Sequence, residues 1–429
     1  MIKIYDINEL SIKEILARTP ENTAQTVKIE KTVDRIISGV RIGGDSALID
    51  FTKKFDKVKI SNLRVTEQEI EAAYRDTDCE FISILKEAAE NIRYFHNMQL
   101  KNGFESTEKD GIVLGQKITP LKRVGIYVPG GTASYPSTVL MNAIPAKIAG
   151  VEEIIMVTPP DKNGNIPPDI LAAAYIAGVT VIYKVGGAQA IAALAYGTES
   201  IPRVDKIVGP GNIFVATAKR KVFGTVGIDM IAGPSEILII ADTTAEPSCI
   251  AADMLSQAEH DKNASAVLIC TCKEFGRRVS EEIEYQLNDL PRGEIARVSI
   301  DNNGKIIVVR GIDEAVEISN EIAPEHLEVC TDNPFDYLNK ISNAGSIFLG
   351  KNTPESLGDY FAGPNHTLPT SGTARFSSPL SVDDFTKKSS YISYTRDALD
   401  RVSDKVITFA EREGLDAHAR SVSSRKSVL

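Results

Sequence analysis

The stretch VGIYVPGG, residues 124–131, decides the fold class of this chain. Val124–Val128 is a short apolar run of the kind that forms a buried strand, and the proline and glycines after it end the strand in a turn. A helical pattern follows at about 137–149. A strand that leads through a glycine-rich turn into a helix is the unit from which parallel sheets are built.

The same unit recurs along most of the chain that follows. Further strands are expected at 153–158, 180–185, 206–208, 236–241, 264–271, 305–309, 327–330 and 346–349. Further helices are expected at 169–177, 188–196, 212–222, 247–259 and 273–287. This alternation predicts right-handed crossovers and a parallel sheet in each of two α/β units, with a boundary near Gly233-Pro234. Residues 23–100 and the tail from Val382 have mostly helical patterns.

The composition of the chain argues against several classes of protein. The 429 residues carry a formal net charge of -10 and no long basic run, which argues against nucleic-acid binding. The five cysteines include no Cys-x-x-Cys pair, so neither a disulfide framework nor a thiolate zinc site is indicated. There is no signal-peptide apolar region and no apolar run long enough to span a bilayer, so we expect a protein of the reducing cytoplasm without a membrane partner.

Glycines follow three expected strands of the first α/β unit. They lie in Pro129-Gly130-Gly131-Thr132, Gly186-Gly187-Ala188-Gln189 and Gly209-Pro210-Gly211-Asn212. Ligands of open parallel sheets bind where strands end, and glycine lets backbone N–H groups approach a phosphate at a helix N-terminus. None of the loops is G-x-G-x-x-G, and each alone is most simply a tight turn. The three together make a nucleotide site an equally good interpretation.

A polar motif, SQAEHD at residues 256–261, ends the helix expected at 247–259. Gln257 and His260 are three residues apart, so they lie on one helix face and could bind a divalent metal if further ligands arrive from elsewhere. A single pair of this kind is more often part of a polar surface stripe. The remaining histidines of the second half also lie close to carboxylates or amides. Nitrogen and oxygen ligands for one zinc ion could come from Gln257, His260, Asp359 and His418.

The neighbours Glu325 and His326 suit acid–base catalysis, because imidazole titrates near neutral pH and a carboxylate can orient it or activate water. The alternative is that the two residues form an exposed cap at a helix end.

With these motifs in view, the chain closely resembles the histidinol dehydrogenase family from about Val33 to the C-terminus. The resemblance rests on the number and order of its motifs, which are VGIYVPGG (124–131), GGAQAIAA (186–193), GPGN (209–212), AGPSE (232–236), SQAEH (256–260), APEHL (323–327), GDY (358–360) and GPNH (363–366).

The resemblance implies a zinc-dependent enzyme that oxidises L-histidinol to L-histidine through L-histidinaldehyde. Two successive hydride transfers to two NAD would complete histidine biosynthesis. By motif match, one zinc ion per subunit would be bound by Gln257, His260, Asp359 and His418. NAD would be contacted by Tyr127, Gln189 and Asn212. The substrate would be contacted by the zinc ligands together with Ser235, His326, His366 and Glu413, and the acid–base pair would be Glu325 and His326.

The resemblance also implies a homodimer in which the C-terminal segment reaches the site of the partner subunit, so that His418 and Glu413 would serve the other site. We expect an α/β fold with two incomplete Rossmann-like parallel-sheet domains and small helical N- and C-terminal segments. The expected parts are an arm at 1–22, an NAD-binding domain at 123–235, a metal-binding and catalytic domain made of 23–122 with 236–381, and a helical tail at 382–429.

Two other functions fit parts of the pattern. A zinc hydrolase would use the same ligands, but it leaves the three glycine-rich loops unexplained. A non-catalytic zinc- or nucleotide-binding subunit fits an intact metal site, but it does not need the pair of Glu325 and His326. Because zinc has no redox role, a dehydrogenase must pass the hydride to a cofactor, and the loops provide a place for one.

Overall fold

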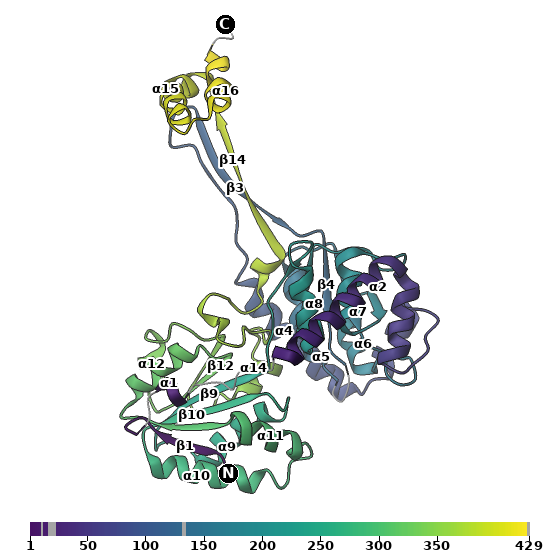
Figure 1. The fold of residues 1–429 in the computed structure, drawn as a ribbon, viewed down its shortest axis with the longest axis vertical. Coiled ribbons are helices and arrows are strands. Elements are labelled where there is room, and N and C mark those ends of the chain that lie inside the picture. The colour runs from purple at the N-terminus through teal and green to yellow at the C-terminus, as the bar shows by residue number, and fades with distance from the viewer. Residues whose placement is uncertain (10–11, 16–22, 131–133, 427–429) are drawn as a thin grey trace. The chain divides into compact units, whose positions relative to one another are not determined.

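The computed structural model describes residues 1–9, 12–15, 23–130 and 134–426 of the chain (Figure 1). The described residues form two compact units. The first unit comprises residues 1–99 and 121–385, and the second comprises residues 100–120 and 386–429. Both parallel sheets belong to the first unit, and an antiparallel sheet belongs to the second.

One parallel sheet, which we call the β4 sheet, has five strands among the described residues, in the order β6-β5-β4-β7-β8. Ile126 of its central strand lies opposite Met156 on one side and Val208 on the other. Its strands are β4 (Arg123–Tyr127), β5 (Glu153–Thr158), β6 (Val181–Lys184), β7 (Lys206–Val208) and β8 (Gly227–Ile228). The helices between them are α5 (Pro136–Ile148), α6 (Pro168–Ala177), α7 (Gly187–Tyr196) and α8 (Ile213–Val222).

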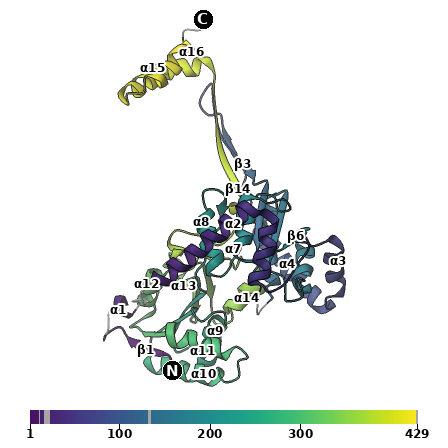
Figure 2. The same cartoon turned by 45° about the vertical axis from the view of Figure 1, so that its right-hand side comes forward.

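Three helices that precede this sheet in the chain pack against its helices (Figures 1 and 2). They are α2 (Thr23–Phe55), α3 (Glu67–Asp76) and α4 (Cys79–Asn97). The apolar stripe of α2 shares a core with α7 and α8, and that of α4 shares a core with α5. This packing differs from the expected grouping of 23–122 with 236–381, because the apolar faces of these helices complement the helices of the β4 sheet. The division of the chain into domains stays a prediction.

The second parallel sheet, the β9 sheet, has six strands within the described ranges, in the order β1-β11-β10-β9-β12-β13. Its strands are β1 (Lys3–Asp6), β9 (Glu236–Ala241), β10 (Ser265–Cys270), β11 (Lys305–Val308), β12 (His326–Cys330) and β13 (Ser346–Leu349). The helices associated with it are α1 (Ile12–Ile15), α9 (Pro247–Ala258), α10 (Lys273–Gln286), α11 (Gly293–Asn303), α12 (Ile312–Ile322), α13 (Phe335–Leu338) and α14 (Glu355–Tyr360). Short 3-10 turns follow at Thr373–Arg375 and Val382–Phe385.

The N-terminal residues take part in the β9 sheet. The segment Lys3–Asp6, expected to be part of an appended arm, pairs in parallel with β11 at the edge of the sheet. Ile2 is 5% exposed and packs in the core beneath that edge. Residues 10–11 and 16–22 of the expected arm lie outside the described part of the chain.

The second unit combines a strand ribbon with two helices. Its antiparallel strands are β2 (Phe104–Ser106), β3 (Ile112–Pro120) and β14 (Thr386–Tyr394), and its helices are α15 (Arg396–Arg412) and α16 (Asp416–Lys426). The helical tail expected from Val382 therefore contains a strand, because Thr386–Tyr394 pairs along its whole length with Ile112–Pro120. Serine, threonine and tyrosine in that segment suit a pleated surface better than a helix.

The two parallel sheets and their helices confirm the expected α/β fold, with helices near both ends of the chain. No helix in the described part of the chain is both long and apolar enough to cross a membrane. In the β4 sheet the strands end next to the glycine-rich loops singled out in the sequence, as expected for a parallel sheet. In the β9 sheet the motifs AGPSE and APEHL instead lie where strands β9 and β12 begin.

Candidate active site

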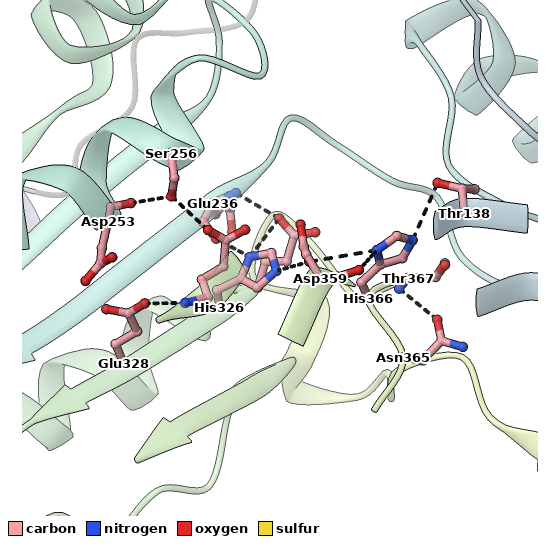
Figure 3. A network of polar contacts seen from close by, with 12 residues as sticks. Thr138, Glu236, Asp253, Ser256, His326, Glu328, Asp359, Asn365, His366 and Thr367 are labelled. Carbon is pink, nitrogen blue, oxygen red and sulfur yellow. Dashed lines mark hydrogen bonds and ion pairs between the residues drawn. The ribbon is translucent and has the colours of Figure 1, made fainter. Parts of the chain in front are cut away.

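His326 is the first residue of β12 in the β9 sheet (Figure 3), and Glu325 directly precedes this strand. Ala323 ends α12 with a left-handed backbone conformation (φ 53°), and the chain enters the strand three residues later. The side chains of the pair are buried, with Glu325 7% and His326 3% exposed. The interpretation of the pair as an exposed helix cap is therefore wrong.

The backbone of Glu236, the first residue of β9, holds both members of the pair. Its N–H donates to Glu325 Oε2 at 2.8 Å, and its carbonyl oxygen lies 3.0 Å from His326 Nδ1. Only a protonated Nδ1 can donate to that carbonyl, so in the neutral imidazole Nε2 carries the free lone pair. No described residue forms a hydrogen bond with Nε2, which lies 3.8 Å from Asp359 Oδ1. His326 is thus oriented with a basic nitrogen towards Asp359.

The surroundings shift the acidity of both groups. Burial raises the pKa of Glu325 to about 8. Burial disfavours the charged form of His326 and so lowers its pKa. The nearby carboxylates of Glu325 and Asp359 have the larger combined effect and raise the pKa of His326 to about 10. Glu325 Oε2 and His326 Nδ1 are 3.7 Å apart, so the two groups titrate as a pair. Such a pair can accept and release protons at a buried reaction centre.

Beside this pair, His260, Glu355 and Asp359 form a cluster whose ligand atoms lie within 4.8 Å of one another. Burial lowers the pKa of His260 and keeps its imidazole neutral. Burial also opposes ionisation of Asp359, but the neighbouring histidines outweigh it and lower the pKa of this carboxyl to about 2. A neutral imidazole and an ionised carboxylate are the forms that bind a metal ion.

Gln257 supplies a further indication of a metal. It lies one turn before His260 at the end of α9 and is 1% exposed. Its Oε1 is buried and has no hydrogen-bond partner in the described part of the chain. A buried amide oxygen without a partner is costly unless a ligand satisfies it. Together with His260 and Asp359, this atom fits the nitrogen and oxygen donor set of a zinc ion.

Glu355 was not found by sequence reasoning. It is 2% exposed, its N–H donates to Glu328 Oε1 at 2.7 Å, and its Oε2 accepts from Ser256 Oγ at 2.9 Å. Burial raises its pKa to about 7. The signal was its position four residues before Asp359, which places both carboxylates on one face of the short helix α14.

His366 connects the cluster to the β4 sheet (Figure 3). Its Nδ1 lies 3.0 Å from the backbone oxygen of Asp359, and its Nε2 lies 3.5 Å from Thr138 Oγ1 on α5. The adjacent Asn365 donates to the backbone oxygen of Met141 on the same helix at 2.6 Å. The site therefore lies where the loop with Asn365 and His366 contacts helix α5, which belongs to the β4 sheet region. Ser235, the remaining predicted substrate residue of this unit, directly precedes β9.

A cavity of about 840 Å³ opens at the ends of the β4 strands. Tyr127, Gln189 and Asn212, the three residues expected to contact NAD, all line it, together with Gly130 and Gly187. The cavity has the volume of a site for a small molecule or cofactor. Gly131 and Thr132 of the first glycine-rich loop lie outside the described residues.

The walls of this cavity are held by hydrogen bonds between the loops. Tyr127 Oη accepts from the N–H of Gly187 at 3.0 Å. Asn212 caps α8, because its Oδ1 accepts from the N–H groups of Phe214 and Val215 at 3.0 and 3.2 Å. Gly209 has a φ of 110°, and a Cβ there would lie 2.2 Å from the oxygen of Tyr127. Glycine is required at this position because no side chain fits.

A buried ion pair fixes the same Gly209. Lys219 and Asp229 are paired, with side chains only 2% and 1% exposed. Lys219 Nζ donates to the oxygen of Gly209 at 2.9 Å, and the N–H of Gly209 donates to Asp229 Oδ2 at 2.7 Å. Both backbone groups of the glycine are thus bound to buried charges, which fixes the loop that carries Asn212.

Residues 19–426 match the family model described as histidinol dehydrogenase. The chain belongs to the histidinol dehydrogenase family.

Similar members of the family cover the chain almost end to end. The histidinol dehydrogenase of Clostridium acetobutylicum is 60% identical over 401 residues, which are 94% of this chain and 93% of that protein. That of Listeria monocytogenes serovar 1/2a is 57% identical over 419 residues, which are 98% of this chain and 97% of that protein. The crystal structure of histidinol dehydrogenase from Elizabethkingia anophelis has a TM-score of 0.93 at 40% identity and covers 99% of this chain and 98% of that chain.

Two of the expected site residues lie in the second unit. Glu413 directly follows α15 and His418 lies on α16, and both are exposed. Both line one hollow of about 420 Å³, together with Phe409 and Leu415. The structure therefore brings these two residues together on one small surface of the second unit.

Proposed function

We propose that this protein oxidises L-histidinol to L-histidine through L-histidinaldehyde, in a zinc-dependent reaction that uses two NAD and completes histidine biosynthesis. The observation that carries the proposal is the buried pair of Glu325 and His326 beside the cluster of His260 and Asp359. Membership of the family agrees with this chemistry.

The first part of the proposal concerns the metal. Gln257, His260, Asp359 and His418 would bind one zinc ion, which when present would bind nitrogen atoms of the substrate and so fix its carbinol carbon. The buried oxygen of Gln257 and the ionised Asp359 support this assignment within the first unit. Ser235, His366 and Glu413 would contact the substrate around the metal.

The second part concerns the proton transfers. In its neutral form, His326 would accept the hydroxyl proton of the alcohol at Nε2, while its Nδ1–H stays bound to the Glu236 carbonyl. Glu325 would then accept a proton from the water that adds to the aldehyde. Once His326 has released the first proton to solvent, it would accept the hydroxyl proton of the resulting hydrate. His326 would thus act on the hydroxyl groups of the alcohol and of the hydrate, and Glu325 would act on the water that forms the hydrate.

The third part concerns the cofactor. The cavity at the ends of the β4 strands would hold NAD, with contacts from Tyr127, Gln189 and Asn212. The bound nicotinamide would accept the hydride that the substrate carbon loses in each oxidation. The fixed glycine-rich loops support this placement, because a rigid wall lowers the cost of ordering a ligand.

The fourth part concerns assembly. We propose a homodimer in which the tail of each subunit supplies Glu413 and His418 to the site of its partner. The second unit has exposed apolar side chains around these residues, with Phe409 68%, Val406 42% and Leu415 42% exposed. An apolar surface next to two functional side chains suits contact with another subunit.

Turnover by the zinc-loaded protein tests the proposal against its rivals. With L-histidinol and NAD, we expect NADH and L-histidine as products, and a His326→Gln variant that still binds zinc should be inactive. Absence of NADH formation by wild-type protein with zinc bound would favour a zinc hydrolase or a non-catalytic binding subunit. Full turnover by the variant would remove His326 from the mechanism.

A further inference from the structure

The C-terminal end of α2 has a carboxylate in a position that is unfavourable for stability. Asp56 directly follows α2, and its N–H donates to the oxygen of Thr52 at 2.9 Å. A negative charge at this end of a helix opposes the helix dipole. Asp56 Oδ2 is also buried without a hydrogen-bond partner among residues 1–9, 12–15, 23–130 and 134–426. Burial of an unpaired carboxylate costs free energy, and here it raises the pKa of Asp56 to about 6.

Other carboxylates nearby have visible structural roles. Asp34, on the same helix, forms an ion pair with Lys221 at 2.9 Å. Asp161, which also lines the cavity, accepts the N–H groups of Asn163 and Asn165 at 2.8 and 2.9 Å and so forms a turn. Asp56 has no comparable partner, so the folded chain alone does not explain its charge.

The cavity gives Asp56 a partner from outside the chain. Asp56 lines the same cavity as Tyr127, Gln189 and Asn212. Burial and the nearby charge of Asp56 raise the pKa of the Tyr127 hydroxyl to about 12, so the carboxylate is close to a predicted cofactor contact. An unsatisfied anionic acceptor in a cavity matches a ligand that carries hydroxyl donors.

We propose that Asp56 accepts hydrogen bonds from the 2′ and 3′ hydroxyls of the adenosine ribose and thereby selects NAD over NADP, an inference that rests on the proposed function. A carboxylate in this role accepts the free 2′ hydroxyl of NAD, whereas the 2′ phosphate of NADP would bring like charges together. Asp56 is then a specificity-determining residue, and its unfavourable position in the free protein is relieved when the cofactor binds.

The test compares wild type with Asp56→Asn, using L-histidinol and either NAD or NADP. We expect the variant to lose roughly 10-fold in kcat/KM for NAD, since a charge-assisted hydrogen bond is lost. The value for NADP should stay the same or rise, so the preference for NAD should fall by about 10-fold or more. An unchanged preference would overturn the proposal.

A control and a stability measurement separate this role from a structural one. Asp50→Asn removes the same charge from an exposed position on the same helix and should leave the preference unchanged. Asp56→Asn should not lower the melting temperature without cofactor, because the carboxylate has no partner to lose. A lower melting temperature with an unchanged preference would show that Asp56 is structural.

The wild-type measurement distinguishes a failure of the proposed function from a failure of the role of Asp56. No turnover with NAD by the zinc-loaded wild type would overturn the proposed function, and the role of Asp56 with it. Turnover with NAD together with an unaltered preference in the variant would overturn the role of Asp56 alone.

Discussion

The β4 sheet and the β9 sheet share one architecture but present different chemistry, the first where its strands end and the second where strands β9 and β12 begin. The β4 sheet presents glycine-rich loops around a cavity, and the walls are fixed by bonds to backbone groups such as those of Gly209 and Gly187. The β9 sheet presents buried ionisable side chains, with Glu325 and His326 beside Asp359. The difference agrees with the proposed division of function, in which one sheet binds the cofactor and the other binds the metal and transfers protons.

The largest expected effect is on the β9 side. His326→Gln should lower kcat for both oxidations by roughly 10²- to 10⁴-fold, because the base is lost from both steps. NAD affinity should stay the same, since His326 is not a wall of the cavity. Single-turnover rates with L-histidinol and with L-histidinaldehyde, together with NAD titration, check this. A variant that loses NAD binding would break the proposed division.

The next effect is on the stability of the β4 side. Lys219→Met leaves Asp229 buried without its partner, so the free energy of unfolding should fall by about 3–5 kcal/mol. The KM for NAD should rise, because the Gly209 loop loses one of its two anchors, while zinc content should not change. Lys206→Met is the control, since its ion pair with Asp384 is less buried than that of Lys219 and its loss should cost less. Chemical denaturation and metal analysis provide the measurements, and equal losses in both variants would contradict the role of the buried pair.

A smaller effect should separate the two members of the catalytic pair. Glu325→Gln keeps an oxygen that can accept the N–H of Glu236 but removes the base that activates water. We expect oxidation of L-histidinaldehyde to slow by roughly 100-fold, and oxidation of the alcohol to slow less. Rapid-mixing rates for each substrate measure the two steps separately. Equal slowing would mean that Glu325 acts through His326 and not on water.

The carboxylates of the metal cluster should differ in their effect on zinc affinity, and one of them should give the smallest effect of all. Asp359→Asn should weaken zinc binding by about 100-fold or more, since a proposed direct ligand loses its charge. Glu355→Gln should weaken it by only roughly 10-fold, because we place this residue next to the ligands and not among them. Zinc affinity from competition with a chelator gives the ranking. A loss of zinc affinity in Glu355→Gln as large as that in Asp359→Asn would show that Glu355 is itself a ligand.

Sequence reasoning succeeded where the chemistry leaves a local pattern. Alternating strands and helices gave the α/β class, and the glycine-rich loops pointed to the cavity that Tyr127, Gln189 and Asn212 line. Glu355 and Asp56 were missed because a single carboxylate forms no motif, and only its surroundings in the folded chain distinguish it.

The failures in the fold have a similar physical origin. Strand β14 was missed because its stability comes from pairing with β3, far away in the sequence. Similarly, the edge strand β1 pairs with β11, about three hundred residues later in the chain. The helical patterns of α2 to α4 show an apolar face but do not show which sheet that face will cover.

The most direct test of the account is the number of NADH molecules formed per L-histidinol consumed by the zinc-loaded wild-type protein in excess NAD. The account predicts two, because the aldehyde stays bound, is hydrated and loses a second hydride. A ratio of one, with free L-histidinaldehyde as the product, would contradict it and would leave a simple alcohol dehydrogenase in which Glu325 has no water to activate.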